Sequence, residues 1–228
     1  VRGVLPSTEW KRKTYKRPEQ QKWYAGETIS LGIGQGYNTF TMLQLATATS
    51  ALANGGQRMT PRVLQAKQDP LTHQSQPVVG APAQNLGYNP EHLSVVRNGL
   101  VGVTTGGTSA QVFAGAAYTS AGKTGTAQAV TIGQKDKYNA AKMAEHQRDH
   151  ALYMAFAPAE APRIAVAAIV ENAGFGAAHA APIVRRVFDY WLLDQYPNEE
   201  DIAATQKGLT GRPVGTPRHK NDVPLGKP

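Results

Sequence analysis

The sequence predicts an α/β (α+β) fold, in which antiparallel strands and helices share one core. Three patterns indicate this class. Apolar residues recur at helical spacing from Thr41 onward, two short apolar runs flank a proline-containing turn at residues 158–162, and an amphipathic stretch covers residues 182–196. With 228 residues, the chain is long enough to bury a core of ordinary size.

The N-terminal part of the chain shows no clear period. Residues 1–27 mix charged, proline and aromatic residues, which predicts an irregular segment lying over a core. Residues 28–31 make a short apolar approach to the glycine-rich run at residues 32–36. We expect a tight turn at this run, leading into the first helix.

Two helices with recognisable start signals come next. Thr41 and Gln44 form the capping box of the first helix, and an Asn-Gly-Gly run ends it. Pro90 stands at or near the first position of the second helix, which carries a leucine and valine stripe. Between the two helices, residues 62–67 predict a strand, and residues 68–88 predict a surface excursion.

The second half of the chain is predicted to hold most of the sheet. Residues 128–150 are long and polar, so we expect an exposed excursion, with helical parts left open. Residues 152–157 and 164–170 predict a hairpin of two buried strands. Residues 182–196 predict a helix that closes the fold. The side chains expected to pack on the sheet are Ile183, Val184, Val187, Trp191 and Leu192.

Residues 1–196 are therefore expected to form the folded part of the chain. From residue 197 the composition turns to proline, glycine and charge, with few apolar anchors. Such a segment buries too little apolar surface to offset the conformational entropy lost on ordering. We therefore predict that residues 197–228 form a disordered C-terminal tail.

The net charge of +8 is concentrated near the N-terminus. Residues 1–25 hold seven Lys/Arg and two Glu, which accounts for +5 of the total. A basic run of this kind is most often a solvated surface, with an anionic partner such as glycan or lipid headgroups as the alternative. No nucleic-acid-binding pattern accompanies it, so we expect no nucleic-acid partner. The longest apolar runs are too short to span a bilayer, and no signal peptide is recognised.

The stretch Lys123-Thr124-Gly125-Thr126 is the strongest candidate for a functional site. In a strand, Thr124 and Thr126 lie on one face, so two hydroxyls can bind one carboxylate while the Lys123 ammonium supplies the opposite charge. Gly125 would let a ligand approach the backbone closely. The alternative is a glycine-containing hairpin strand with a solvated lysine.

Three other motifs lack features of the sites that they suggest. The glycine run at residues 32–36 lacks the spacing of a dinucleotide-binding turn. His146 and His150 would share a helical face, but Gln147 replaces the glutamate of a metalloprotease helix and no third ligand is evident, so we expect no metal and no cofactor. Ser120 and Lys123 form a literal S-x-x-K, yet a strand would place them on opposite faces.

Several blocks in fixed order resemble one family. They are the turn at residues 33–37 leading into the first helix, the Asn-Gly-Gly run, the Lys123 stretch with Ala127 and Gln128, and Arg148-Asp149-His150 before the next strand. Together these blocks resemble the class B penicillin-binding proteins, specifically the elongation-type penicillin-binding protein 2. The resemblance covers about residues 1–196, as the C-terminal part of a transpeptidase (penicillin-binding) domain.

The resemblance implies a serine-type peptidoglycan D,D-transpeptidase that binds penicillin and has a β-lactamase-like fold, with helices on both faces of an antiparallel sheet. It implies that Lys123, Thr124 and Thr126 recognise the substrate carboxylate and that substrate lies beside Gly125. It also implies that the backbone N–H of Thr126 is an oxyanion donor, which makes Lys123 and Thr126 the catalytic residues of this chain.

The sequence departs from the family pattern in one large respect. The family's nucleophilic serine, paired lysine and S-x-N residues find no match here, so we expect them upstream and the fold to be incomplete in this chain, which alone would be inactive. Three alternatives stay open: a non-catalytic β-lactam-binding sensor, a scaffold module and the cell-division paralogue.

The resemblance also implies partners and a location. The partners are peptidoglycan stem peptides, β-lactams, and the glycan polymerase and scaffold proteins of the elongation complex. The location is the periplasmic face of the bacterial inner membrane, reached through an N-terminal anchor that the sequence does not contain.

Overall fold

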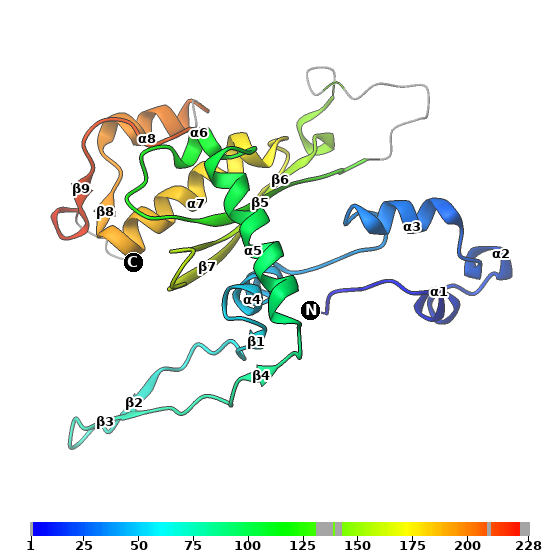
Figure 1. Cartoon of the computed structure of the whole chain (residues 1–228), viewed down its shortest axis with the longest axis horizontal. Helices are drawn as coiled ribbons and strands as arrows, with labels where there is room; N and C mark the ends of the chain where they lie inside the picture. Colours follow the sequence, from blue (N-terminus) through cyan, green and yellow to red (C-terminus); the bar gives the residue numbers. More distant parts are fainter. Residues whose placement is uncertain (1, 131–138, 140–142, 209–210, 224–228) are drawn as a thin grey trace.

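The computed structural model describes residues 2–130, 139, 143–208 and 211–223. Its centre is a three-stranded antiparallel sheet of β5 (Ala121–Ala127), β6 (His150–Ala157) and β7 (Ile164–Val170), in the order β5-β6-β7 (Figure 1). The predicted hairpin is thus confirmed as β6 and β7. Its proline-containing turn allows the two apolar runs to pair from Ala151 opposite Val170 to Ala157 opposite Ile164.

Helices cover both faces of this sheet. Alternation along β6 places Ala151, Tyr153 and Ala155 on one face, where they pack with Val184 and Phe188 of α7 (Gly176–Leu193). The opposite face carries Phe156 and Ala121, which pack with Ala53 of α4 (Met42–Ala53) and with residues of α5 (Pro90–Thr105). The predicted mixed fold, an antiparallel sheet flanked by helices, is confirmed.

The signals that predicted α4 and α5 are present in the structure. The Thr41 hydroxyl accepts a hydrogen bond from the Gln44 N–H, and the Gln44 side chain accepts one from the Thr41 N–H, which completes the capping box. Asn89 caps α5 through the Glu91 N–H, and Pro90 is the first helical residue.

The N-terminal segment is more regular than predicted. It forms α1 (Thr8–Thr14), α2 (Pro18–Gln21) and α3 (Ala25–Gly32), so the expectation of an irregular segment is wrong. Its organising residue is polar. The Lys11 side chain is buried, bonds the Glu27 carboxylate and the carbonyl of Lys22, and lies against the rings of Trp23, Tyr24 and Tyr37. Because a buried lysine and aromatic rings organise this segment, its sequence shows no apolar periodicity.

The chain between α4 and α5 forms an arm that extends from the sheet in Figure 1. Its base is the pair β1 (Gln57–Arg58) and β4 (Gln84–Asn85), and its end is the pair β2 (Ala66–Gln68) and β3 (Ser75–Pro77). Only the last two residues of the strand predicted at residues 62–67 belong to β2. The predicted surface excursion is confirmed, because the strands β2, β3 and β4 are exposed.

Helix α7 begins earlier than predicted and buries a different stripe. It starts at Gly176 and contains Pro182, so its first turn lies over the sheet before the predicted start. Val184 packs in the core and Leu192 packs against it, as expected. The expectation that three other residues pack on the sheet is wrong: Ile183, Val187 and Trp191 are 41%, 38% and 57% exposed. Ala180, Ala181 and Phe188 are buried instead, because the helix is apolar on two faces and the sequence does not say which one meets the sheet.

Other short elements connect these parts. They are α6 (Ala110–Phe113), which follows α5, and the 3₁₀ helix η2 (Glu145–Gln147), which precedes β6. The excursion expected at residues 128–150 lies largely outside the described residues. Among the described residues, no helix combines the length and apolar character that crossing a membrane requires.

The C-terminal segment that was predicted to be disordered contains helices and strands. Beyond α7 the chain forms β8 (Gln195–Tyr196), α8 (Glu199–Gln206), β9 (Arg218–His219) and the 3₁₀ helix η3 (Lys220–Asp222), and β8 pairs with β9. The reason is a polar contact rather than an apolar one: Asp201 is 1% exposed and accepts two hydrogen bonds from Arg186 of α7. Residues 209–210 and 224–228 of the predicted tail lie outside the described residues.

Candidate functional site

The candidate site lies on β5, an outer strand of the described sheet, whose ladder partner is β6. The Thr124 carbonyl accepts a hydrogen bond from Lys123 Nζ at 2.8 Å, and the Thr126 carbonyl accepts one from Gln35 Nε2 at 3.4 Å. Both carbonyls therefore point to the edge of β5 that faces away from β6. Because the N–H and C=O of one strand residue point the same way, the Thr126 N–H lies on this edge too.

The side chains of the predicted site meet partly at this edge. Thr124 and Thr126 share a face by alternation, and both are half-buried. The Thr124 hydroxyl lies 3.1 Å from the hydroxyl of Thr108, which belongs to the turn after α5. Lys123 starts on the opposite face and is exposed, yet its ammonium reaches the Thr124 carbonyl. The structure thus brings Lys123 and Thr124 together.

Gly125 has a packing reason to be glycine. A Cβ added there would lie 3.3 Å from the Cβ of Leu152, its partner on β6. This separation is well below the spacing of about 4.5–5.5 Å usual for paired strand residues. Gly176 is also close, since a Cβ there would lie 2.6 Å from the Gly125 carbonyl oxygen. The first turn of α7 therefore lies against β5. Close packing alone would favour a glycine at position 125, whether or not a ligand approaches there.

The core behind β5 is held by Tyr153. Its hydroxyl lies 2.8 Å from the Ser109 hydroxyl, and a Cβ on Gly122 would meet the Tyr153 ring at 2.7 Å. Burial raises the pKa of Tyr153 to about 12, against a smaller opposing effect of the Ser109 hydrogen bond. The phenol is therefore neutral near pH 7 and acts as a packing and hydrogen-bonding group.

Gln35 is a site residue that the sequence did not single out. It lies in the turn after α3, where Gly34 and Gly36 have φ values of 79° and 72°, a region that favours glycine. Asn38 Nδ2 donates to the Gln35 carbonyl at 3.0 Å and steadies the turn. A helix rather than a strand precedes the glycines, which removes the dinucleotide-binding alternative. The only sequence signal for Gln35 was its place in this glycine-rich turn.

The rejected nucleophile pair is also separated in the structure. Ser120 is 3% exposed and precedes β5, and its carbonyl accepts a hydrogen bond from Thr104. Lys123 is exposed on β5. Their odd spacing places them on opposite faces, as predicted.

Two further motifs are placed by the structure. His146 lies in η2 and His150 opens β6, so the two histidines do not share the helical face that a zinc site would need. The expectation that the chain holds no Y-x-N, a variant of the S-x-N pattern, is wrong, because residues 196–198 are Tyr-Pro-Asn. The Asn198 side chain, however, caps α8 at the Asp201 N–H and bonds the carbonyls of Val214 and Thr216.

The segment before β6 is held by the turn after β7. Asn172 donates from its side chain to the Arg148 carbonyl and from its backbone to His150 Nδ1, both at 3.0 Å. Gly174 donates to the Asp149 carbonyl at 2.8 Å. These bonds confirm the expectation that Arg148-Asp149-His150 is an ordered segment leading into a strand.

Comparison with known proteins agrees with this arrangement. Residues 11–189 match the family model of the penicillin-binding protein transpeptidase domain. The chain is 40% identical over 206 residues to the peptidoglycan D,D-transpeptidase MrdA of Haemophilus influenzae, covering 86% of this chain and 30% of that protein. It is 43% identical over 200 residues to MrdA of Acinetobacter baumannii, covering 86% of this chain and 28% of that protein.

Solved structures show the same relationship. The crystal structure of Pseudomonas aeruginosa PBP2 in complex with WCK 5153 is 42% identical, with a TM-score of 0.67 over 84% of this chain and 37% of that one. The complex of Helicobacter pylori PBP2 with MreC contains a chain that is 27% identical, with a TM-score of 0.63 over 84% of this chain and 31% of that one. The chain thus spans about a third of the length of these relatives, and it belongs to the penicillin-binding protein transpeptidase family.

Proposed function

We propose that this chain forms the carboxylate-binding side of a peptidoglycan D,D-transpeptidase site that also binds β-lactams. The observation that carries the proposal is the open edge of β5, where the Lys123 ammonium and the main-chain groups of Thr124 and Thr126 lie together. Family membership supports this assignment, because relatives that carry the transpeptidase name match most of the chain.

In the proposed reaction a serine from a segment outside this sequence attacks the carbonyl between the two terminal D-alanines of a stem peptide. The C–N bond breaks, the terminal D-alanine leaves with a proton on its amine, and an ester forms on the serine. An amine of a neighbouring stem peptide then attacks that ester, which forms the cross-link and returns the proton to the serine. A β-lactam would acylate the same serine, and its ring would open.

Four consecutive residues of β5 have a role in this scheme. Lys123 and the hydroxyls of Thr124 and Thr126 bind the carboxylate of the terminal D-alanine, since an ammonium and two O–H donors match its charge and its lone pairs. The Thr126 N–H, on the open edge, is one of two donors to the oxyanion. Substrate would extend along the edge beside Gly125.

The nucleophile is proposed to come from elsewhere. The S-x-x-K of this sequence is Ser120 to Lys123, and its serine is buried and faces away from the lysine. A carboxylate-binding edge without a nucleophile binds substrate but cannot form an ester. The chain alone is therefore expected to be inactive.

The partners and the location follow the same family proposal. Relatives named MrdA favour the elongation-type enzyme over the cell-division paralogue. The solved complex of a similar protein with MreC makes a scaffold protein a candidate partner, alongside the glycan polymerase of the elongation complex. We place the site at the periplasmic face of the inner membrane. A non-catalytic β-lactam sensor or scaffold module is the second candidate. A scaffold module would not be acylated by penicillin, whereas a sensor would be acylated but would cross-link no stem peptides.

The test is acylation by a fluorescent penicillin in a protein that joins this chain to a serine-bearing segment. Lys123→Ala should slow acylation by roughly a hundredfold or more, because it removes a charged donor from the anion site. Lys67→Ala, which removes an exposed lysine from β2, is the matched control and should leave the rate unchanged. Equal rates for both variants would show that Lys123 does not act in the site, and absence of acylation with every added segment would favour the scaffold module.

A further inference from the structure

A cavity of about 530 Å³ lies between the end of α7 and the C-terminal tail. The loop after α6 forms one wall, the second half of α7 forms the floor, and residues 211–217 cross over it. A volume of this size is in the range of small-molecule sites. Its charged lining residues are Arg185, Arg186, Asp189, Asp201 and Arg212.

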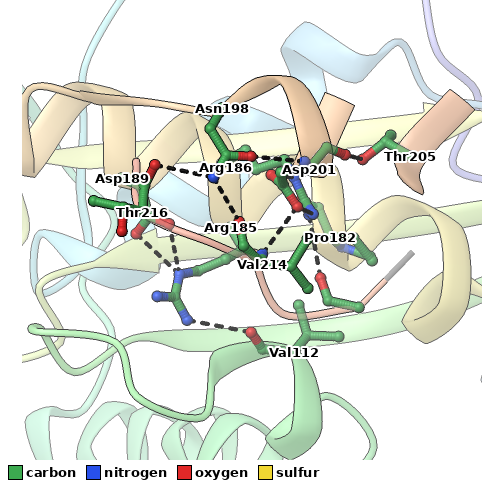
Figure 2. Close-up of polar contacts among 11 residues, drawn as sticks. Val112, Pro182, Arg185, Arg186, Asp189, Asn198, Asp201, Thr205, Val214 and Thr216 are labelled. Atoms are coloured by element: carbon green, nitrogen blue, oxygen red, sulfur yellow. Dashed lines mark hydrogen bonds and ion pairs between the residues drawn. The ribbon is translucent and has the colours of Figure 1, made fainter. Parts of the chain in front are cut away.

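Both carboxylates in this lining are already paired with arginines of α7. Asp189 accepts hydrogen bonds from Arg185 Nε on both oxygens and from the Tyr118 hydroxyl. Asp201 accepts from Arg186 Nε at 2.8 Å, from Arg186 Nη2 at 2.5 Å and from the Val214 N–H at 3.1 Å. Figure 2 shows the two arginines reaching these carboxylates from α7. Each carboxylate thus accepts three hydrogen bonds and has its charge balanced by its own arginine.

The arginines, in contrast, keep unused donors. Arg185 is 7% exposed and its Nη1 donates to the Val112 carbonyl (Figure 2). Its other hydrogen bonds within the described residues come from Nε, so Nη2 keeps its donors. Arg212 stands on the rim, and its guanidinium likewise meets no acceptor in the described part of the chain. Three arginines and two aspartates leave the lining with one excess positive charge. Arg185 Nη2 is not among the fully buried polar atoms that lack a partner, so solvent reaches it, and an anion in the cavity can replace water as its acceptor.

From this geometry we infer that the cavity binds a small oxyanion, a phosphate or carboxylate group, between Arg185 and Arg212. The planar guanidinium matches two oxygens of such a group. Arg185 supplies a pre-oriented donor, because Asp189 and Val112 fix its other nitrogens. Arg212 supplies the uncompensated charge. The site depends on the tail, which lies beyond residue 189, where the family match ends.

Binding would also couple to the tail. Arg212 is tied through Pro213 to Val214, whose N–H bonds Asp201. An anion that draws Arg212 toward Arg185 therefore adds a second attachment of the tail to α7. The inference predicts that a bound oxyanion protects the tail from opening.

The test is a titration of the 228-residue chain with inorganic phosphate, followed by amide NMR. The amides of Gly115, Arg212 and Gly215 should shift and saturate, and amide exchange in α8 should slow. Arg212→Ala should weaken the apparent affinity by about tenfold or more, since a hydrogen bond to a charged group is lost. Arg17→Ala, which removes an exposed arginine from the basic N-terminal run, is the control and should bind phosphate as the parent chain does.

Acetate at the same ionic strength distinguishes the two oxyanions, and sodium chloride controls for screening. Saturable shifts at these amides with phosphate alone identify a phosphate site, and equal binding of acetate identifies a carboxylate site. Shifts that follow chloride equally, that do not saturate, or that persist in Arg212→Ala would overturn the inference.

Discussion

Strand β5 and the C-terminal tail are both peripheral, but they are held in different ways. β5 pairs with β6 along seven residues and lies against α5 and α7, yet among the described residues its outer edge carries only side-chain contacts. The tail has few apolar anchors and is held to α7 by a buried ion pair, with Asp201 1% exposed. Sheet pairing can leave an edge open for a ligand, whereas a polar attachment must be fully satisfied to hold at all. The comparison supports the proposal that β5 binds substrate, and it shows that the tail is attached to α7 by polar contacts.

The largest expected effect comes from removing the polar attachment of the tail. Asp201→Ala leaves Arg186 buried without its carboxylate, which typically costs about 3–5 kcal/mol. We expect amide exchange in α8 to accelerate to the rate of an open segment while β6 keeps its protection. Glu200→Ala, an exposed neighbour, is the control and should change exchange little. If both variants behave alike, the ion pair does not hold the tail.

Next in size is the effect of a side chain at Gly125. Gly125→Val crowds Leu152 and should lower stability by about 1–3 kcal/mol, and it should also slow penicillin acylation in the joined protein by tenfold or more. The same change in a Leu152→Gly background separates these effects, because that background lacks the Cβ that the new side chain would meet, and the Leu152→Gly variant is the reference for its melting temperature. We expect its melting temperature to recover while acylation stays slow. Recovery of both would mean that the glycine serves packing alone.

A smaller effect is expected at Gln35. Gln35→Ala removes one hydrogen bond to the Thr126 carbonyl, worth about 0.5–1.5 kcal/mol, so acylation should slow by up to about tenfold. Gln20→Ala, on the exposed face of α2, serves as control. A slower acylation step with unchanged penicillin binding would indicate that Gln35 positions the Thr126 N–H. An unchanged acylation rate would indicate that Gln35 serves only the turn in which it lies.

The smallest effect concerns acid sensitivity of the N-terminal segment, which is also held by a polar pair. The hydrogen bond from Lys11 holds the pKa of Glu27 below its ordinary value of 4.5, with a smaller contribution from the Tyr24 N–H. A depressed carboxyl pKa stabilises the fold above pH 4.5, and this contribution is lost as the pH falls through the folded-state pKa. Tryptophan fluorescence should therefore change below about pH 4.5. Glu27→Gln should remove this step, and its persistence would point to another carboxylate.

The sequence was most informative where apolar period and local caps coincide. Helix α4 was predicted from its stripe and from the capping box of Thr41 and Gln44, and β6 and β7 from two apolar runs around a proline-containing turn. These signals lie within a few residues of each other. The same holds for the Lys123 stretch, whose small residues and register place it as a strand.

The sequence was least informative where polar groups pair over a distance. Lys11 with Glu27 and Arg186 with Asp201 are 16 and 15 residues apart, and neither pair follows a helix or strand period. Composition alone therefore predicted an irregular N-terminus and a disordered tail. Gln35 and Thr126 are 91 residues apart, so their contact appears only when α3 and β5 are placed together.

The central claim is that this chain holds the carboxylate side of the site and not its nucleophile. Incubation of the 228-residue chain with penicillin, followed by intact-mass measurement, tests it most directly. Removal of a nucleophile lowers a covalent step by several orders of magnitude, so no mass increase is expected. Adding a serine-bearing segment should produce an adduct on that segment and leave this chain unmodified. A penicillin adduct on the chain alone, mapped to Ser120, would contradict the account.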